Sequence, residues 1–115
     1  MDEELSVKFI QSASTVLRAL GHPARIKIIE YLRGGKKSVG QIQAILNLSQ
    51  PVTSQHLRYM YSKGIVDYIQ DGTTYNYFIA NDFINKIYDC ISNYQEKVQS
   101  GEWNLESMNF KEMEV

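Results

Sequence analysis

LSQPVTSQHLRYM, residues 48–60, is the stretch of sequence that decides the fold. Ser49 is a good helix N-cap because its hydroxyl can accept a hydrogen bond from a free backbone N–H, and Pro51 suits a first turn, where its missing N–H does no harm. At helical spacing, one side of the stretch is suited to a core and carries Thr53, Leu57 and Met60. The opposite side is short and polar and carries Gln50, Pro51, Ser54, Gln55 and Arg58. The stretch therefore predicts an amphipathic helix with a polar outer face.

This polar outer face has a chemistry that suits DNA. Amide and hydroxyl groups both donate and accept hydrogen bonds, as the base edges of a major groove do, and Arg58 suits a phosphate or a guanine. An ordinary solvated helix face has the same composition, since short polar faces are common. The helix is therefore a candidate for the recognition helix of a helix-turn-helix, and the plain solvated face is the alternative.

The length and composition predict one globular domain without a membrane segment. The chain has 115 residues, of which 43% are hydrophobic and 22% are charged. No apolar run approaches the roughly 18 residues of a membrane span, and the acidic N-terminus is unlike a basic signal peptide. The single cysteine, Cys90, excludes an intrachain disulfide and fits a reducing compartment. We expect a cytoplasmic protein with no membrane partner.

The charges are unevenly distributed, although the net charge is only −1. Residues 18–63 hold eight basic side chains and a single acid, Glu30, so the net charge of this segment is +7. The remaining positions hold four basic and twelve acidic residues. Positive charge gathered around a candidate recognition helix is the electrostatic footprint of a protein that neutralises phosphates, and it favours the DNA interpretation.

Three helices are predicted before the recognition helix. Apolar residues at spacings of three and four indicate a first helix over about residues 3–20. Pro23 suits the first position of a second helix, which glycines end after residue 33. Ser38 and Gln41 fit a capping box for a short third helix, and the turn at residues 47–48 joins it to the recognition helix. The third and fourth helices would thus form the helix-turn-helix.

The periodicity changes after residue 64. Residues 65–70 and 73–79 are rich in β-branched and aromatic side chains and flank Asp71-Gly72, a strong signal for a two-residue hairpin turn. A hairpin directly after a recognition helix is a wing. From Asn81, a suitable N-cap, apolar residues at intervals of three and four predict a long last helix with a heptad seam.

The first and last helices carry more apolar surface than so small a core can cover, so we expect a two-fold dimer built on them. The alternative is that the last helix packs only on its own domain. The expected dimer contacts are Phe9, Ala13, Val16, Ile84, Ile87, Ile91 and Tyr94. The predicted fold is mainly α with a β-hairpin wing, a winged helix-turn-helix over residues 1–99, followed by an acidic tail over residues 100–115.

Taken in order, these motifs resemble the ArsR/SmtB family of winged helix-turn-helix repressors. The run LRALGHPARIKIIEYL at residues 17–32, the recognition helix and the Asp-Gly hairpin cover roughly residues 16–91. The resemblance implies a homodimer that binds double-stranded DNA at an inverted-repeat operator and represses transcription until an effector binds. It places Gln50, Ser54 and Gln55 at base edges. The predicted DNA contacts are completed by Ser49, Thr53, Arg58, Lys36, Lys37, Thr73 and Thr74.

The chain departs from the family at the usual sensing sites. Many metal-sensing members carry Cys-x-Cys where this chain has Ser38 and Gly40. The last helix offers carboxylates without the histidines that transition metals prefer, and His22 and His56 share no local motif, so we expect no metal site and no cofactor. Cys90 resembles one of the two cysteines of thiol-sensing relatives, but no resolving thiol is present. We expect a small buried core residue, with a single redox-responsive or sulfur-responsive thiol as the alternative.

The wing departs from the family as well, because residues 65–79 contain two acids, Asp67 and Asp71, and no basic side chain. We therefore expect the helix-turn-helix to dominate DNA binding, and Tyr68, Tyr75 and Tyr77 to pack the hairpin. An enzyme is not expected, since the sequence has no phosphate-binding loop and no motif for nucleophilic catalysis. A winged-helix module for protein contacts is the alternative, favoured by the wing and opposed by the positive segment.

Overall fold

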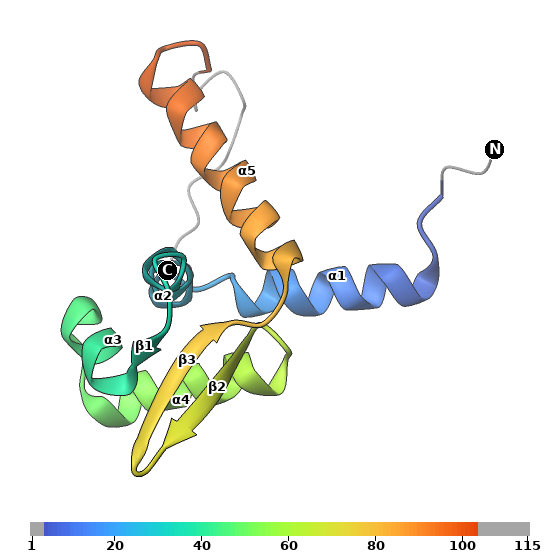
Figure 1. Ribbon diagram of the computed structural model, residues 1–115. Coiled ribbons are helices and arrows are strands. Elements are labelled where there is room, and N and C mark those ends of the chain that lie inside the picture. Colours follow the sequence, from blue (N-terminus) through green and yellow to red (C-terminus); the bar gives the residue numbers. More distant parts are fainter. Residues whose placement is uncertain (1–3, 104–115) are drawn as a thin grey trace.

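The computed structural model describes residues 4–103, which form helices around a small antiparallel sheet (Figure 1). The elements follow the chain in the order α1 (Val7–Ala19), α2 (Pro23–Leu32), β1 (Lys37–Ser38), α3 (Val39–Leu46), α4 (Gln50–Ser62), β2 (Val66–Asp71), β3 (Thr74–Ile79) and α5 (Asp82–Gln99). The predicted fold, mainly α with a hairpin wing, is confirmed. Most of the expected acidic tail lies outside the described residues.

Capping side chains set the boundaries of the helix-turn-helix. Ser38 Oγ accepts a hydrogen bond from the Gln41 N–H at 3.2 Å, and Gln41 Oε1 accepts one from the Ser38 N–H at 2.9 Å. This is the predicted capping box at the start of α3. Asn47 ends α3 in a left-handed conformation with φ of 55°, and Ser49 Oγ accepts the Val52 N–H to begin α4. The turn between the two helices is therefore only residues 47–49.

The first two helices begin at caps that the sequence did not make obvious. Ser6 Oγ accepts the Phe9 N–H at 3.1 Å, so α1 begins at Val7 and not near residue 3. His22 Nδ1 accepts the Ala24 N–H at 3.1 Å and caps α2 in place of the more usual serine or aspartate.

The wing belongs to a three-stranded sheet with the order β1-β3-β2. Asp71 pairs with Thr74, so the turn residues are Gly72 and Thr73, and the predicted Asp71-Gly72 turn is wrong by one residue. Gly72 has a φ of 62° and Thr73 has no positive φ, which is the pattern of a type II′ turn with glycine first. The strand β1 was not expected from the sequence; in it Lys37 pairs with Tyr77 of β3, which ties the start of α3 to the wing.

The core lies where α2, α3, α4 and the base of the hairpin meet. The predicted inner face of α4 is confirmed, because Thr53, Leu57 and Met60 are fully buried. They pack against buried apolar side chains from the other elements, namely Ala19, Leu20, Ile28, Ile29, Leu32, Ile42, Ile65, Val66, Tyr77 and Ile84. This close packing beneath α4 fixes how its outer face is presented.

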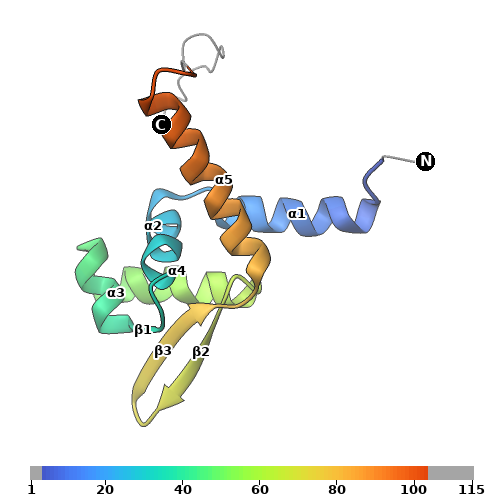
Figure 2. The ribbon, with the colours of Figure 1, turned by 45° about the horizontal axis from the view of Figure 1, so that its top comes forward.

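The two terminal helices project from this core. In Figures 1 and 2, α5 rises on the side opposite the hairpin tip and α1 leaves the body sideways. The molecule measures 50 × 36 × 27 Å, and its radius of gyration of 16.4 Å exceeds the roughly 13 Å expected of a compact domain of about 100 residues. No helix within residues 4–103 is long and apolar enough to cross a membrane.

The first half of α5 is fastened to α2. The Arg33 guanidinium donates to the Asn85 carbonyl at 3.1 Å and to the Asp89 carboxylate at 2.7 Å, and it lies 4.6 Å from the centroid of the Tyr88 ring. The Tyr88 hydroxyl donates to the Glu30 carboxylate at 2.7 Å, and this bond, with Lys27 beside it, holds the pKa of Glu30 below its ordinary value. These contacts set the direction in which α5 leaves the body.

Candidate nucleic-acid interface

The outer face of α4 presents the predicted polar side chains to solvent. Gln50, Gln55 and Arg58 are exposed and Ser54 is half-buried. Gln50 Nε2 donates to Ser54 Oγ at 3.0 Å across one helical turn, so these two side chains form a single patch. The exposed face of α4 therefore offers both donors and acceptors, which is the chemistry that base edges require.

A groove of about 490 Å³ runs between this face of α4 and the wing. Its lining comes from both sides and consists of Val39, Gln50, Ser54, Arg58, Tyr61, Tyr68, Tyr75 and Tyr77. An adjoining hollow is lined by Gln50, by the start of α3, and by Thr73 and Thr74 at the wing tip. The fold thus brings the predicted residues of α4 and the wing tip to one surface. Gln55 is exposed on α4 but lines neither hollow.

Two of the predicted DNA contacts serve the fold. Thr53 is fully buried and its hydroxyl donates to the Ser49 carbonyl at 2.9 Å. Because it lies on the inner side of α4 with Leu57, the assignment of Thr53 as a DNA contact is wrong. Ser49 is exposed, and its hydroxyl accepts the Val52 N–H as the helix cap while its own proton stays available for a donor bond.

The predicted backbone contacts Lys36 and Lys37 do not line the groove. Lys36 is exposed beside the opposite face of the hairpin, in a hollow that also contains Ile69 and Phe78. Lys37 is half-buried, and its Nζ lies 5.0 Å from the centroid of the Tyr31 ring. The structure therefore separates both lysines from the side chains of α4.

Other cations of the positive segment are engaged within the domain. Lys27 pairs with Glu30 at 3.0 Å, and Arg33 pairs with Asp89 at 2.7 Å. Arg58, in contrast, is exposed and lines the groove. The net charge of the segment therefore overstates how many cations face the groove.

The four tyrosines that line the groove form a cluster. The Tyr68 ring centroid lies 5.1 Å from that of Tyr61, 5.1 Å from that of Tyr75 and 5.4 Å from that of Tyr77. Packing of the hairpin by its tyrosines is confirmed, and Tyr61, which the sequence analysis missed, extends the cluster onto α4. Burial raises the pKa of the Tyr77 hydroxyl, which therefore stays neutral. The cluster holds the wing and α4 together as one surface.

The side of α4 next to α2 carries a junction that the sequence analysis missed. Arg25 Nε donates to His56 Nδ1 at 3.2 Å, and the Arg25 guanidinium lies 4.0 Å from the centroid of the Tyr59 ring. The His22 and His56 ring centroids are 4.6 Å apart. Burial, followed by the neighbouring His22 and Arg25, lowers the pKa of His56. A sequence signal exists only in retrospect, in the three-residue spacing of His56 and Tyr59 along one side of α4.

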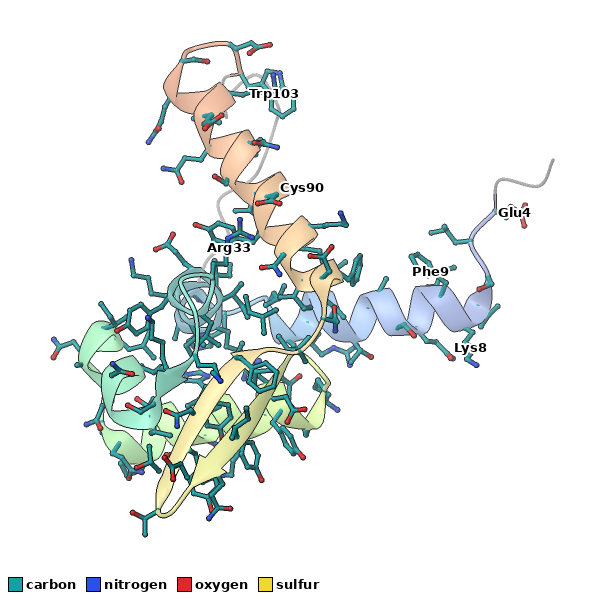
Figure 3. The ribbon with its side chains drawn as sticks, viewed as in Figure 1. Glu4, Lys8, Phe9, Arg33, Cys90 and Trp103 are labelled. Atoms are coloured by element: carbon teal, nitrogen blue, oxygen red, sulfur yellow. The ribbon has the colours of Figure 1, made fainter. Side chains whose placement is uncertain are left out.

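The terminal helices form a second candidate surface, suited to a protein partner. Phe9 is 49% exposed and Ile91 is 39% exposed, and Figure 3 shows Phe9 projecting from α1. Further exposed apolar residues lie in or next to these two helices, and are Leu5, Val7, Ile10, Leu17 and Phe83.

The apolar residues of the predicted α5 seam divide into some that pack on their own domain and some that stay available for a dimer contact. Ile84 is fully buried in its own domain, so its assignment to the dimer surface is wrong, and Ile87 and Val16 pack partly against the same core. Ala13 and Tyr94 are half-buried, and the Tyr94 ring packs on Trp103 with centroids 5.6 Å apart. The start of α5 thus packs on its own chain, as the alternative proposed.

Cys90 is exposed on α5, so the expectation of a buried core cysteine is wrong (Figure 3). The reason is its position on the helix, because Ile84 and Ile87 define the inward side and residue 90 falls outside it. Within the described part of the chain, no three or more histidine, cysteine or acidic side chains are gathered as metal ligands.

Comparison with known proteins agrees with this geometry. Residues 22–68 match the model of a family described as bacterial regulatory protein, arsR family. The chain is 34% identical over 84 residues to the HTH-type transcriptional regulator YgaV of Escherichia coli. This alignment covers 72% of this chain and 85% of YgaV. It is 33% identical over 76 residues to a biofilm growth-associated repressor of Agrobacterium fabrum, with 66% of this chain and 65% of the repressor covered.

Solved structures share the fold. HlyU from Vibrio cholerae has a TM-score of 0.73 at 25% identity, with 77% of this chain and 97% of HlyU covered. NolR from Sinorhizobium fredii has a TM-score of 0.71 at 27% identity, with 81% and 96% covered. The Mb0332 domain from Mycobacterium bovis, described as a homodimeric winged helix-turn-helix, has a TM-score of 0.75 at 20% identity, with 88% and 95% covered. The chain belongs to the ArsR family of bacterial regulatory proteins and is a DNA-binding transcriptional regulator, not an enzyme.

Proposed function

We propose that the protein is a homodimeric repressor that binds an inverted-repeat operator. The observation that supports this most directly is the groove in which Gln50, Ser54 and Arg58 of α4 face the wing. In this proposal Gln50, Ser54 and Gln55 contact base edges, and Arg58 contacts a guanine or a phosphate. The wing tip adds hydroxyl donors to the backbone from Thr73 and Thr74. The Agrobacterium relative, named a repressor, favours the same direction of regulation.

The exposed apolar surface of α1 and α5 supports the dimer. A single chain leaves Phe9, Ile10 and Ile91 partly in water, and pairing two copies about a two-fold axis covers both sets at once. The Mb0332 domain, which has the same fold, is described as homodimeric. Because Arg33 fastens α5 to α2, the pairing also fixes the separation of the two α4 helices. The operator half-sites would then lie about 34 Å apart, or a multiple of that distance.

The proposed repressor works without the metal sites that are usual in the family. The positions where Cys-x-Cys would fall are Ser38 and Gly40, and the Ser38 hydroxyl is used in the capping box of α3. The exposed Cys90 favours one other mode of regulation, in which a single thiol on α5 responds to oxidants or reactive sulfur.

The test removes the polar patch of α4 and leaves the fold intact. Fluorescence anisotropy would compare the wild-type protein with a Gln50→Ala/Ser54→Ala double variant on an operator selected from random duplexes and on unselected duplex. Loss of the base contacts should weaken specific binding by about 10- to 100-fold and leave unselected binding unchanged.

The matched control is a Gln99→Ala/Ser100→Ala variant, which removes the same two residue types at the exposed end of α5. It should bind the operator as the wild type does. If the wild type binds the selected and unselected duplexes equally, the repressor proposal fails and a protein-contact module becomes the better reading of the fold.

A further inference from the structure

The junction between α2 and α4 gives Arg25 a role that its charge alone does not suggest. Arg25 is half-buried and is not among the side chains that line the groove. Its Nε donates to His56 Nδ1 at 3.2 Å and its Nη1 donates to the Ala19 carbonyl at 3.2 Å. The guanidinium also stacks on the Tyr59 ring at 4.0 Å. One side chain therefore joins the end of α1, the start of α2 and the middle of α4.

We propose that Arg25 is a positioning residue for the recognition helix, and that its hydrogen bond to a neutral His56 makes DNA binding weaken as the pH falls. This inference rests on the proposed role of α4 in DNA binding. It adds a means of regulation that needs no effector and no thiol.

The geometry requires His56 to be neutral. Nδ1 can accept from Arg25 only if it carries no proton, and a protonated imidazole has no acceptor nitrogen. Protonation would therefore remove the bond and place a second cation 3.2 Å from the Arg25 guanidinium. The Nδ1 of the neighbouring His22 is also occupied by a hydrogen bond, which it accepts from the Ala24 N–H.

The surroundings of His56 oppose protonation. Burial lowers its pKa most, and the neighbouring His22 and Arg25 lower it further. The other elements that pack on α4 carry few charges near this ring: α3 has no titratable side chain, and Tyr68 of β2 packs on Tyr61. The remaining charged groups of α2 and β2 are exposed or paired with one another, and are Lys27, Glu30, Asp67 and Asp71.

The sign and the window of the effect follow from this arrangement. The bonded arrangement has its full advantage over an unbonded one above the ordinary histidine pKa of 6.5, and this advantage shrinks as the pH falls below it. In the free folded protein the pKa of His56 is already lowered, so operator affinity should hold down to that lowered pKa and then fall by up to about 10-fold per subunit for each further pH unit, since one proton is linked. Added positive charge alone would strengthen binding to DNA over the same range.

The experiment measures operator affinity of the full chain by anisotropy, at constant ionic strength, from pH 7.5 down to a pH at which imidazole NMR shows His56 to be protonated. His56→Asn replaces the ring by an amide whose Oδ1 can accept from Arg25 and cannot be protonated in this range. It should bind within about 3-fold of the wild type at pH 7.5 and show a flat pH profile. His22→Asn keeps a good N-cap for α2 and should keep the fall of affinity with pH, displaced toward higher pH because His22 no longer lowers the pKa of His56.

A salt titration separates positioning from direct contact with DNA. Arg25→Gln should weaken binding by about 10-fold without changing the slope of log K against log salt, whereas loss of a phosphate contact lowers that slope by about 0.9 per subunit. Arg58→Gln, in the groove, is the comparison for a cation that faces DNA. A lower slope for Arg25→Gln, or a wild-type affinity that holds or rises at a pH where His56 is protonated, would overturn the proposal.

Imidazole ¹⁵N NMR of the free protein keeps this inference distinct from the proposed function. It should report an unprotonated Nδ1 on His56 at pH 7.5 and a titration below that of an ordinary histidine, and Arg25→Gln should move that titration upward. If these signals appear and the wild type does not select an operator, the DNA-binding proposal has failed. If the operator is selected and His56 titrates as an ordinary histidine, the positioning role proposed for the Arg25–His56 hydrogen bond is wrong.

Discussion

The region from α2 to the base of the wing and the two terminal helices differ in how they cover their apolar side chains. In the first region Leu57 and its neighbours are fully buried by contacts within one chain. In the second, Leu17 is 61% exposed, and Phe9 and Ile91 are also partly exposed to solvent. The first region thus has what it needs to fold, and the second has the composition of an interface. The contrast indicates that folding and assembly draw on separate sets of side chains.

The largest expected effect on stability comes from truncating a side chain in the buried core. Leu57→Ala leaves a cavity beneath α4 and should lower the free energy of unfolding by about 2 to 5 kcal/mol. Denaturant titrations at several protein concentrations would measure it, and the loss should be the same at each concentration. Leu17→Ala removes the same atoms from an exposed site. It should mainly change how the free energy of unfolding depends on protein concentration, because Leu17 would be covered only in the dimer. Equal, concentration-independent losses in both variants would contradict the division.

A charge on the exposed side should act on assembly. Phe9→Asp places a carboxylate on the apolar face of α1 and should weaken dimerisation by about 10- to 100-fold, because each subunit would bury an unpaired charge. Analytical ultracentrifugation would measure this. Figure 3 shows Lys8 and Phe9 on different sides of α1, so Lys8→Asp is the matched control and should leave the assembly unchanged. A dimer that tolerates Phe9→Asp would place the interface elsewhere.

Two serine caps sharpen the comparison at a smaller scale. Ser38→Ala removes the capping box of α3, inside the packed region, and should cost about 1 kcal/mol of global stability. Ser6→Ala removes the cap of α1 at its projecting end, where fraying is local, and should cost only a few tenths. Hydrogen exchange would separate the two: the Ser38 variant should exchange faster throughout the core, and the Ser6 variant only in the first turns of α1.

The smallest effect is expected at Cys90. Cys90→Ser should leave stability and operator affinity unchanged in reducing buffer, because the side chain is exposed and outside the inward side of α5. Anisotropy with and without a persulfide donor or peroxide would show whether the wild type responds. A response that disappears in Cys90→Ser would establish thiol regulation, and one that persists would exclude it.

The fold was predictable because local signals agreed with one another. Short residue spacings along the chain predict the Ser38–Gln41 capping box, the Ser49 cap and the inner side of α4. The observed hairpin turn lies one residue after the predicted one. Asp-Gly and Gly-Thr both suit a two-residue hairpin, and the pairing of Asp71 with Thr74 leaves Gly72 and Thr73 as the turn. The two-residue β1 is too short to leave a periodic pattern.

The candidate site was predictable only in part. The outward residues of α4 follow from helical geometry, but Thr53 shows that a polar side chain on the inner side can be satisfied by its own backbone. Lys36 lies beside the other face of the hairpin, and Lys37 is drawn into β1, where it pairs with Tyr77 and its Nζ lies over the Tyr31 ring. The Arg25–His56 bond joins residues far apart in sequence, so no spacing rule could find it.

The acidic character of the wing has a consequence for how the protein would search a genome. Cations that grip phosphates bind any sequence, and a chromosome offers on the order of a million or more competing sites. With Asp67 and Asp71 on the hairpin and no basic side chain between residues 65 and 79, the wing adds little to this indiscriminate attraction. Fewer molecules would then be held on unrelated DNA, so a small cellular pool of the protein could keep its operator occupied.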